Sequence, residues 1–149
     1  MLKLLLLLFL LVSVCVTIHG IGMLLGLRWL DRFERTGDAT LRGMFWLLIR
    51  LVYGLLMLHL LQILVWALSY QWSGCFPDFA TSFYYSATSY STAGYGDVNP
   101  PGNWRILGAI EAVTGILMFG WSTGVLFAVA SRFQKHFTAP GPTTIPEIL

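Results

Sequence analysis

The sequence predicts an all-α membrane protein, with three transmembrane helices and one shorter helix that does not span the bilayer. Only 11% of the 149 residues are charged and 56% are hydrophobic, whereas soluble domains carry roughly 25% charged residues. Three apolar stretches are long enough to cross a hydrocarbon core of about 30 Å. A shorter segment, rich in aromatic and hydroxyl side chains, lies between the second and the third stretch. The formal net charge of +2 is too small to favour a nucleic-acid partner.

The first apolar stretch, residues 4–27, contains no charged side chain. We interpret it as a retained N-terminal transmembrane helix within residues 1–30. A cleaved signal peptide is the alternative, because Lys3 precedes a leucine-rich run. That run is longer than the core of a typical signal, however, and no Ala-x-Ala-like site follows it. We expect His19, in the second half of this helix, to be buried and hydrogen-bonded rather than a ligand.

The basic residues predict how the chain is oriented in the bilayer. They gather in a connection at residues 31–43 and after the third apolar stretch, whereas residues 71–103 contain no Lys or Arg. By the positive-inside rule, the connection and a flexible tail at 134–149 lie in the cytoplasm, and the N-terminus and residues 71–103 lie outside. We therefore expect a multi-pass protein of the plasma (cell inner) membrane. Neither a voltage sensor nor a soluble ligand-binding domain is visible in the sequence.

The second transmembrane helix is expected at residues 44–70. Arg50 lies near its start, where a long side chain can reach the membrane interface. Polar or amphipathic side chains follow at helical spacing on one face: His59, Gln62, Trp66 and Ser69. We expect His59 and Gln62 to form hydrogen bonds between helices. A proton-sensing role for His59 is the alternative, since histidine titrates near neutral pH.

The most informative segment lies just before the third apolar stretch and reads Thr92-Ala93-Gly94-Tyr95-Gly96-Asp97. Gly94 and Gly96, at alternate positions, can adopt positive φ without a Cβ penalty. If the residues between them have the opposite hand, successive carbonyls turn to one side instead of alternating as in a strand. Four such segments around one axis would form rings of oxygens that replace the hydration shell of a cation. The Thr92 hydroxyl would add an inner ring, and the Tyr95 ring would brace the loop from behind.

This segment resembles the selectivity filter of tetrameric potassium channels, which usually reads Thr-Val-Gly-Tyr-Gly followed by Asp. Here Ala93 replaces the valine. The resemblance covers the pore module of the two-transmembrane type, at about residues 44–133, and leaves the N-terminal helix outside. It implies an outer helix, a re-entrant pore helix, a filter and an inner helix, at 44–70, 77–91, 92–97 and 104–133.

The predicted pore helix begins at Pro77 and Asp78, because proline suits the first helical position and an acid suits the positive end of the helix dipole. About three turns follow, which is too short to span a bilayer. Backbone of this kind is tolerated at membrane depth only where protein buries it or water lines it. The segment is therefore expected to enter the membrane and return.

Several residues around the filter are expected to support it. By the resemblance they are Tyr84, Tyr85, Thr88, Asp97 and Glu111. Thr88 stands where some relatives carry a glutamate that partners the filter aspartate, so Asp97 needs another donor or a water molecule. Glu111 cannot face lipid unpaired without a large energetic cost. We expect it behind the filter, either bonded to pore-helix hydroxyls or paired with Arg105.

The inner helix carries the residues that the resemblance links to gating. Gly115 matches the hinge glycine of the family, and the cavity-facing positions would be Ile116, Phe119, Thr123 and Phe127. Phe127 is a candidate for a constriction near the inner mouth. Three further residues recur every fourth position and form a small-residue face that permits close helix contact: Gly120, Gly124 and Ala128.

Together these patterns predict a potassium channel subunit that assembles as a homotetramer, or with similar chains, in a lipid bilayer. Potassium would bind at Thr92, Ala93, Gly94 and Tyr95, as the permeant ion rather than a cofactor. A weakly selective cation channel is the nearest alternative, because Ala93 loosens the packing of the filter. A non-conducting accessory subunit or part of a potassium transporter is the other. Transporter filters of this ancestry usually keep a single glycine and place four repeats in one chain, unlike this sequence. No pattern of enzymatic residues is visible.

Overall fold

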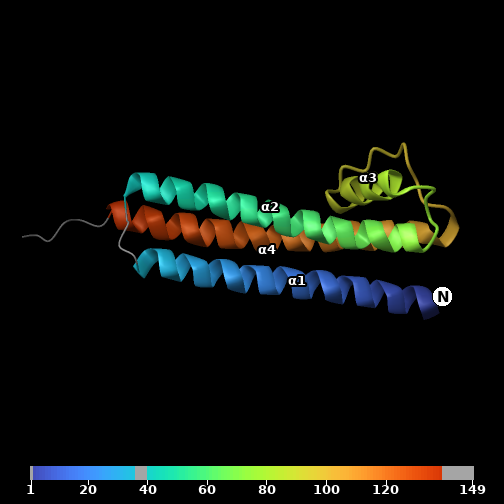
Figure 1. Cartoon of the computed structure of the whole chain (residues 1–149), viewed down its shortest axis with the longest axis horizontal. Helices are drawn as coiled ribbons and strands as arrows, with labels where there is room; N and C mark the ends of the chain where they lie inside the picture. Colours follow the sequence, from blue (N-terminus) through green and yellow to red (C-terminus); the bar gives the residue numbers. More distant parts are fainter. Residues whose placement is uncertain (1, 36–39, 139–149) are drawn as a thin grey trace, which may run out of the picture.

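The computed structural model describes residues 2–35 and 40–138. This part of the chain folds into α1 (Leu2–Arg35), α2 (Leu41–Trp72), α3 (Phe79–Tyr90), the 3-10 turn η1 (Gly102–Trp104) and α4 (Arg105–Thr138). The three long helices lie side by side, and the short α3 lies at the end of the bundle where α1 begins (Figure 1). Spans Leu2–Arg32, Leu41–Trp72 and Arg105–Arg132 are long and apolar enough to cross a membrane. The fold is therefore that of an all-α membrane protein.

The connection between the first two helices is shorter than the predicted 31–43. Helix α1 continues through Arg35, because residues 27–35 contain neither glycine nor proline to stop it. Helix α2 already begins at Leu41, because Thr40 caps it: the threonine hydroxyl accepts a hydrogen bond from the Gly43 backbone N–H at 3.1 Å. Both helices therefore extend beyond their predicted bounds, 1–30 and 44–70.

Helix α3 begins at Phe79, and Asp78 is its N-cap. The aspartate backbone is extended, and its carboxylate accepts from the Thr81 backbone N–H at 2.8 Å and from the Thr81 hydroxyl at 2.9 Å. The hydrogen bond from the Thr81 backbone holds the pKa of Asp78 below its usual value. The prediction that Pro77 occupies the first helical position was wrong, because the capping aspartate follows it and lies outside the helix.

The predicted inner helix and tail also have different bounds in the structure. Helix α4 follows η1 at Arg105 and continues to Thr138, so residues 134–138 of the predicted flexible tail are helical. The rest of that tail, 139–149, lies outside the described residues.

Polar side chains gather inside the bundle, and large apolar side chains cover its outside. Buried polar residues include His19, Gln62, Ser86, Glu111 and Ser122. Leucine, phenylalanine and other apolar side chains are exposed along all three long helices. A soluble bundle would show the reverse pattern, so this distribution fits a lipid surrounding.

Two glycines let α4 approach α3 closely. A Cβ atom added at Gly108 would overlap the Tyr85 hydroxyl, and one added at Gly115 would overlap the Tyr90 carbonyl oxygen. Gly115 thus has a packing role, in addition to the hinge that the resemblance implies. The small-residue face of α4 differs: a Cβ added at either of its glycines would meet no atom within 4 Å. The close helix contact expected there is not made within the described chain.

Candidate functional site

The loop after α3 has positive φ at every second residue. The angle is 62° at Thr92, 50° at Gly94 and 77° at Gly96. The prediction for the two glycines is confirmed. Thr92 was not predicted, because a β-branched residue rarely adopts this conformation and is strained in it. Positive φ at residues 92, 94 and 96 means that the sign of φ alternates along the whole segment 92–97.

Hydrogen bonds tie both ends of this loop to its surroundings. The backbone N–H of Gly94 donates to the Thr88 carbonyl at 3.1 Å, and that of Thr92 donates to the Ser89 carbonyl at 2.9 Å. These two carbonyls belong to the last turn of α3, where they lack helical partners. At the far end, the amide of Asn99 donates to the Gly96 carbonyl at 2.8 Å. The strained loop is therefore held at one end by the last turn of α3 and at the other end by Asn99.

The same loop lies on the surface of the single chain. Residues 91–97 are all exposed, and 73% of the Tyr95 side chain is accessible. Within one chain the exposed Tyr95 ring does not brace the loop, and bracing in a fourfold assembly stays a prediction.

Asp97 is held by Tyr84, whose hydroxyl donates to the carboxylate at 2.8 Å. Because residue 88 is a threonine rather than a glutamate, Asp97 was expected to need another donor, and Tyr84 is that donor. The bond to Asp97 raises the pKa of Tyr84 above its usual value, as expected for a phenol that donates to a carboxylate. The Thr88 hydroxyl instead donates to the Tyr85 carbonyl at 3.0 Å.

Tyr85 turns away from the filter, although it is next to Tyr84 in sequence. Its ring packs against Tyr70 and Phe76, with centroids 5.2 and 5.1 Å apart. The predicted aromatic pair thus divides, one ring toward the filter aspartate and the other into the core. Successive residues of a helix point about 100° apart, which explains the division.

We expect Tyr84→Phe to fold and assemble normally but to reduce the fraction of time that reconstituted channels conduct by a few-fold. The phenylalanine keeps the ring and removes the donor that holds Asp97. Single-channel recording would measure the effect. Tyr53→Phe is the matched control, because Tyr53 is exposed on α2 far from the loop in sequence. Equal open fractions in both variants would contradict this role of Tyr84.

Glu111 of α4 is fully buried, between α2 and α3. Its carboxylate lies 2.6 Å from the Ser86 hydroxyl and accepts from the Tyr70 hydroxyl at 2.8 Å. Of the two predicted arrangements, the structure therefore has the bond to a pore-helix hydroxyl and not the pair with Arg105. The contribution of Tyr70 was not predicted, because nothing in the sequence shows which face of α2 meets α4.

A closed ring of hydrogen bonds joins the four described α-helices at the end of α3 that leads into the loop of residues 91–97. Its members, all buried, are His19 of α1, His59 and Gln62 of α2, Tyr90 of α3 and Ser122 of α4. His59 Nδ1 lies 3.1 Å from the Tyr90 hydroxyl, and Nε2 lies 3.0 Å from that of Ser122. Gln62 Nε2 lies 2.9 Å from His19 Nδ1, and its Oε1 accepts from Tyr90 at 2.9 Å. Ser122 Oγ and His19 Nε2, 3.3 Å apart, close the ring.

The hydrogen bonds of this ring all run in one direction, so that each side chain donates to the next and accepts from the one before. Gln62 Nε2 also donates to a backbone carbonyl one turn earlier in α2, so its Oε1 faces Tyr90 and accepts that proton. The Tyr90 hydroxyl then accepts from His59 Nδ1, which leaves His59 Nε2 as the acceptor for Ser122. Ser122 accepts from His19 Nε2, and His19 Nδ1 accepts from Gln62. Every side chain in the ring is satisfied with both imidazoles neutral. The prediction of interhelical hydrogen bonds is confirmed.

The remaining gating candidates lie along α4. Phe119 stacks on His59, with ring centroids 4.3 Å apart, so it contacts the hydrogen-bonded ring. Thr123 and Phe127 are exposed, the latter by 74%, as is Ile116. These positions thus face away from the rest of the described chain, where lipid or another subunit would meet them.

Three helices able to cross a membrane, with a fourth too short to do so, define an all-α membrane protein. A family model described as an ion channel matches residues 45–132, more than half of the chain. The chain belongs to this ion-channel family, and α1 lies outside the matched region. No curated protein and no solved structure matches the chain.

Proposed function

We propose that this protein is a subunit of a potassium-selective channel, in which four copies bring residues 92–96 around one axis. The observation that supports this most is the positive φ at Thr92, Gly94 and Gly96. Alternation of hand turns successive carbonyls to one side of the chain, and rings of carbonyls are what potassium filters use. Potassium would pass down its electrochemical gradient, held in turn by oxygens of Thr92, Ala93, Gly94 and Tyr95.

The proposed homotetramer follows from the position of the filter on the chain. One chain supplies one loop, and one loop cannot close a ring of oxygens. Residues 91–97, the Tyr95 ring among them, are exposed, and a Cβ added at either glycine of the small-residue face of α4 meets no atom of the described chain within 4 Å. Fourfold assembly would cover these surfaces together. The mass of the protein–detergent complex tests this assembly: a tetramer supports it, and a monomer favours an accessory subunit.

The proposed orientation places the start of α1 and the filter loop outside the cell and the α1–α2 connection in the cytoplasm of the plasma membrane. In the structure, the start of α1 and the loop after α3 lie at the same end of the bundle (Figure 1). Arginines at the other end of the bundle agree with the positive-inside rule.

The experiment that tests the function is the reversal potential of purified protein in liposomes with potassium on one side and sodium on the other. A value near the potassium equilibrium potential supports a selective filter. A value near zero with sustained current would favour the weakly selective channel, which Ala93 keeps as a second candidate.

We expect Ala93→Val to increase the potassium-to-sodium permeability ratio. Two added methyl groups are worth about 1.6 kcal/mol of packing, so the gain in the permeability ratio should not exceed roughly fifteenfold. Reversal potentials of the two proteins under identical gradients measure the change. An unchanged ratio would show that the side chain at this position does not set the width of the filter.

A further inference from the structure

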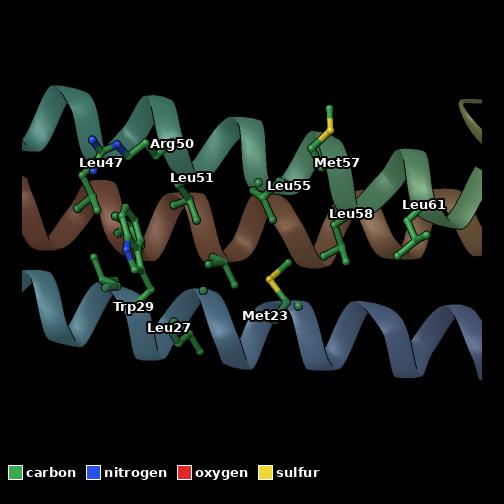
Figure 2. A pocket seen from close by; sticks show the side chains of 16 residues that line it. Met23, Leu27, Trp29, Leu47, Arg50, Leu51, Leu55, Met57, Leu58 and Leu61 are labelled. Atoms are coloured by element: carbon green, nitrogen blue, oxygen red, sulfur yellow. The ribbon is translucent and has the colours of Figure 1, made fainter.

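A cavity of about 410 Å³ lies between α1, α2 and α4, away from the filter loop. This volume falls within the range of pockets that bind small ligands, about 300–1,000 Å³. Figure 2 shows the side chains around it. Its lining includes Gly26 and Trp29 of α1 and Arg50 and Gly54 of α2.

The cavity exists because glycines line it on facing helices. A Cβ atom added at Gly26 of α1 or at Gly54 of α2 would meet no atom within 4 Å. Leucine, methionine and valine side chains form most of the remaining wall. The space is therefore apolar and elongated along the bundle, a shape that suits a hydrocarbon chain better than a polar solute.

Among the described residues, Arg50 is the one charged side chain that lines this apolar cavity, and no acidic one does. Arg50 and Trp29 lie at the same end of the cavity (Figure 2). Residues 51–70 of α2 would cover about 30 Å as a helix, the thickness of a hydrocarbon core. Arg50 thus lies where the core meets the headgroups, at the depth of lipid phosphates, and Trp29 is of the kind found at this interface.

We propose that this cavity binds an anionic phospholipid, with an acyl chain between the helices and the phosphate at Arg50. A guanidinium can make paired hydrogen bonds to phosphate oxygens, and the positive charge favours an anionic headgroup over a zwitterionic one. Because α1 forms one wall, the bound lipid would join the N-terminal helix to the pore module. This site is independent of the proposed ion selectivity.

Fluorescence quenching by brominated lipids tests the proposal with the full chain. The protein is placed in phosphatidylcholine vesicles with a small fraction of either brominated phosphatidylglycerol or brominated phosphatidylcholine. The signal of Trp29 is the difference between the protein and its Trp29→Phe variant. We expect half-maximal quenching at an about fivefold lower fraction of the anionic lipid, the preference that one basic residue near the surface provides.

Two pairs of variants separate the charge from the cavity. Arg50→Gln should abolish the preference, whereas Arg42→Gln, on the same helix but outside the cavity, should keep it. Gly54→Leu should fill the cavity and reduce quenching by both lipids, whereas Val52→Leu, on the same helix but outside the cavity, should not.

Several results would overturn the proposal. Equal quenching by the two lipids, or a preference that survives Arg50→Gln, would remove the headgroup site. Quenching that is unaffected by Gly54→Leu would place the lipid outside the cavity. No quenching of Trp29 by either lipid would mean that something else, such as a helix of a neighbouring copy, fills the space.

Discussion

We expect Gly94→Ala to abolish potassium-selective conduction and the same change at Gly102 to leave it intact. The two glycines have almost the same φ, 50° and 52°. Alanine at such an angle costs roughly 1–2 kcal/mol at either position, and the added Cβ would clash with no neighbour at either one. The two variants therefore carry the same backbone strain, one in the loop after α3 and the other in the turn before α4.

The strain has different consequences at the two positions. In the loop, a return of residue 94 to negative φ would interrupt the alternation between Thr92 and Gly96 and turn neighbouring carbonyls away from the common side. At Gly102, the same relaxation would affect only the turn before α4. Both variants are first shown to assemble equally. Potassium flux into liposomes then tests whether conduction is lost in Gly94→Ala alone. Selective flux through the Gly94→Ala protein would contradict the proposed filter, and loss of flux in both variants would indicate a general defect in folding.

Patterns within one segment made much of this fold predictable. The absence of charge over residues 4–27 predicts a span without any knowledge of its neighbours. Asp78 predicts the start of α3 correctly. Pro77 was placed inside the helix, whereas it precedes the N-cap Asp78. Gly94 and Gly96 signal their own conformation, because their lack of Cβ makes positive φ inexpensive. The family match at 45–132 agrees with the pore module predicted at about 44–133.

Contacts between elements were not predictable to the same degree. The sequence shows that Asp97 needs a donor, but Tyr84 becomes that donor only when α3 and the loop are placed together. Tyr70 and Glu111 lie 41 positions apart, and no periodicity reveals that their faces meet. Thr92 is a different case, because its β-branched side chain disfavours the positive φ that the surrounding structure imposes.

The second large effect is expected from the hydrogen-bonded ring. We expect Gln62→Leu to lower the stability of the assembled protein and to reduce conduction. The change leaves the Tyr90 hydroxyl without its acceptor and His19 Nδ1 without its donor. Each buried group left unsatisfied costs about 1–3 kcal/mol. Thermal unfolding in detergent measures the loss of stability, and liposome flux measures the loss of conduction.

A double-mutant cycle with Tyr90→Phe separates the ring from a general loss of polarity. Tyr90→Phe alone leaves Gln62 Oε1 without a donor and the His59 Nδ1 proton without an acceptor. If both residues act in one ring, the double variant should cost less than the sum of the single ones, because the second change removes a group that is already stranded. Additive losses would show that the contacts act independently. Conduction should fall with stability, since Tyr90 is the last residue of α3 and Thr92, two residues later, begins the alternating loop.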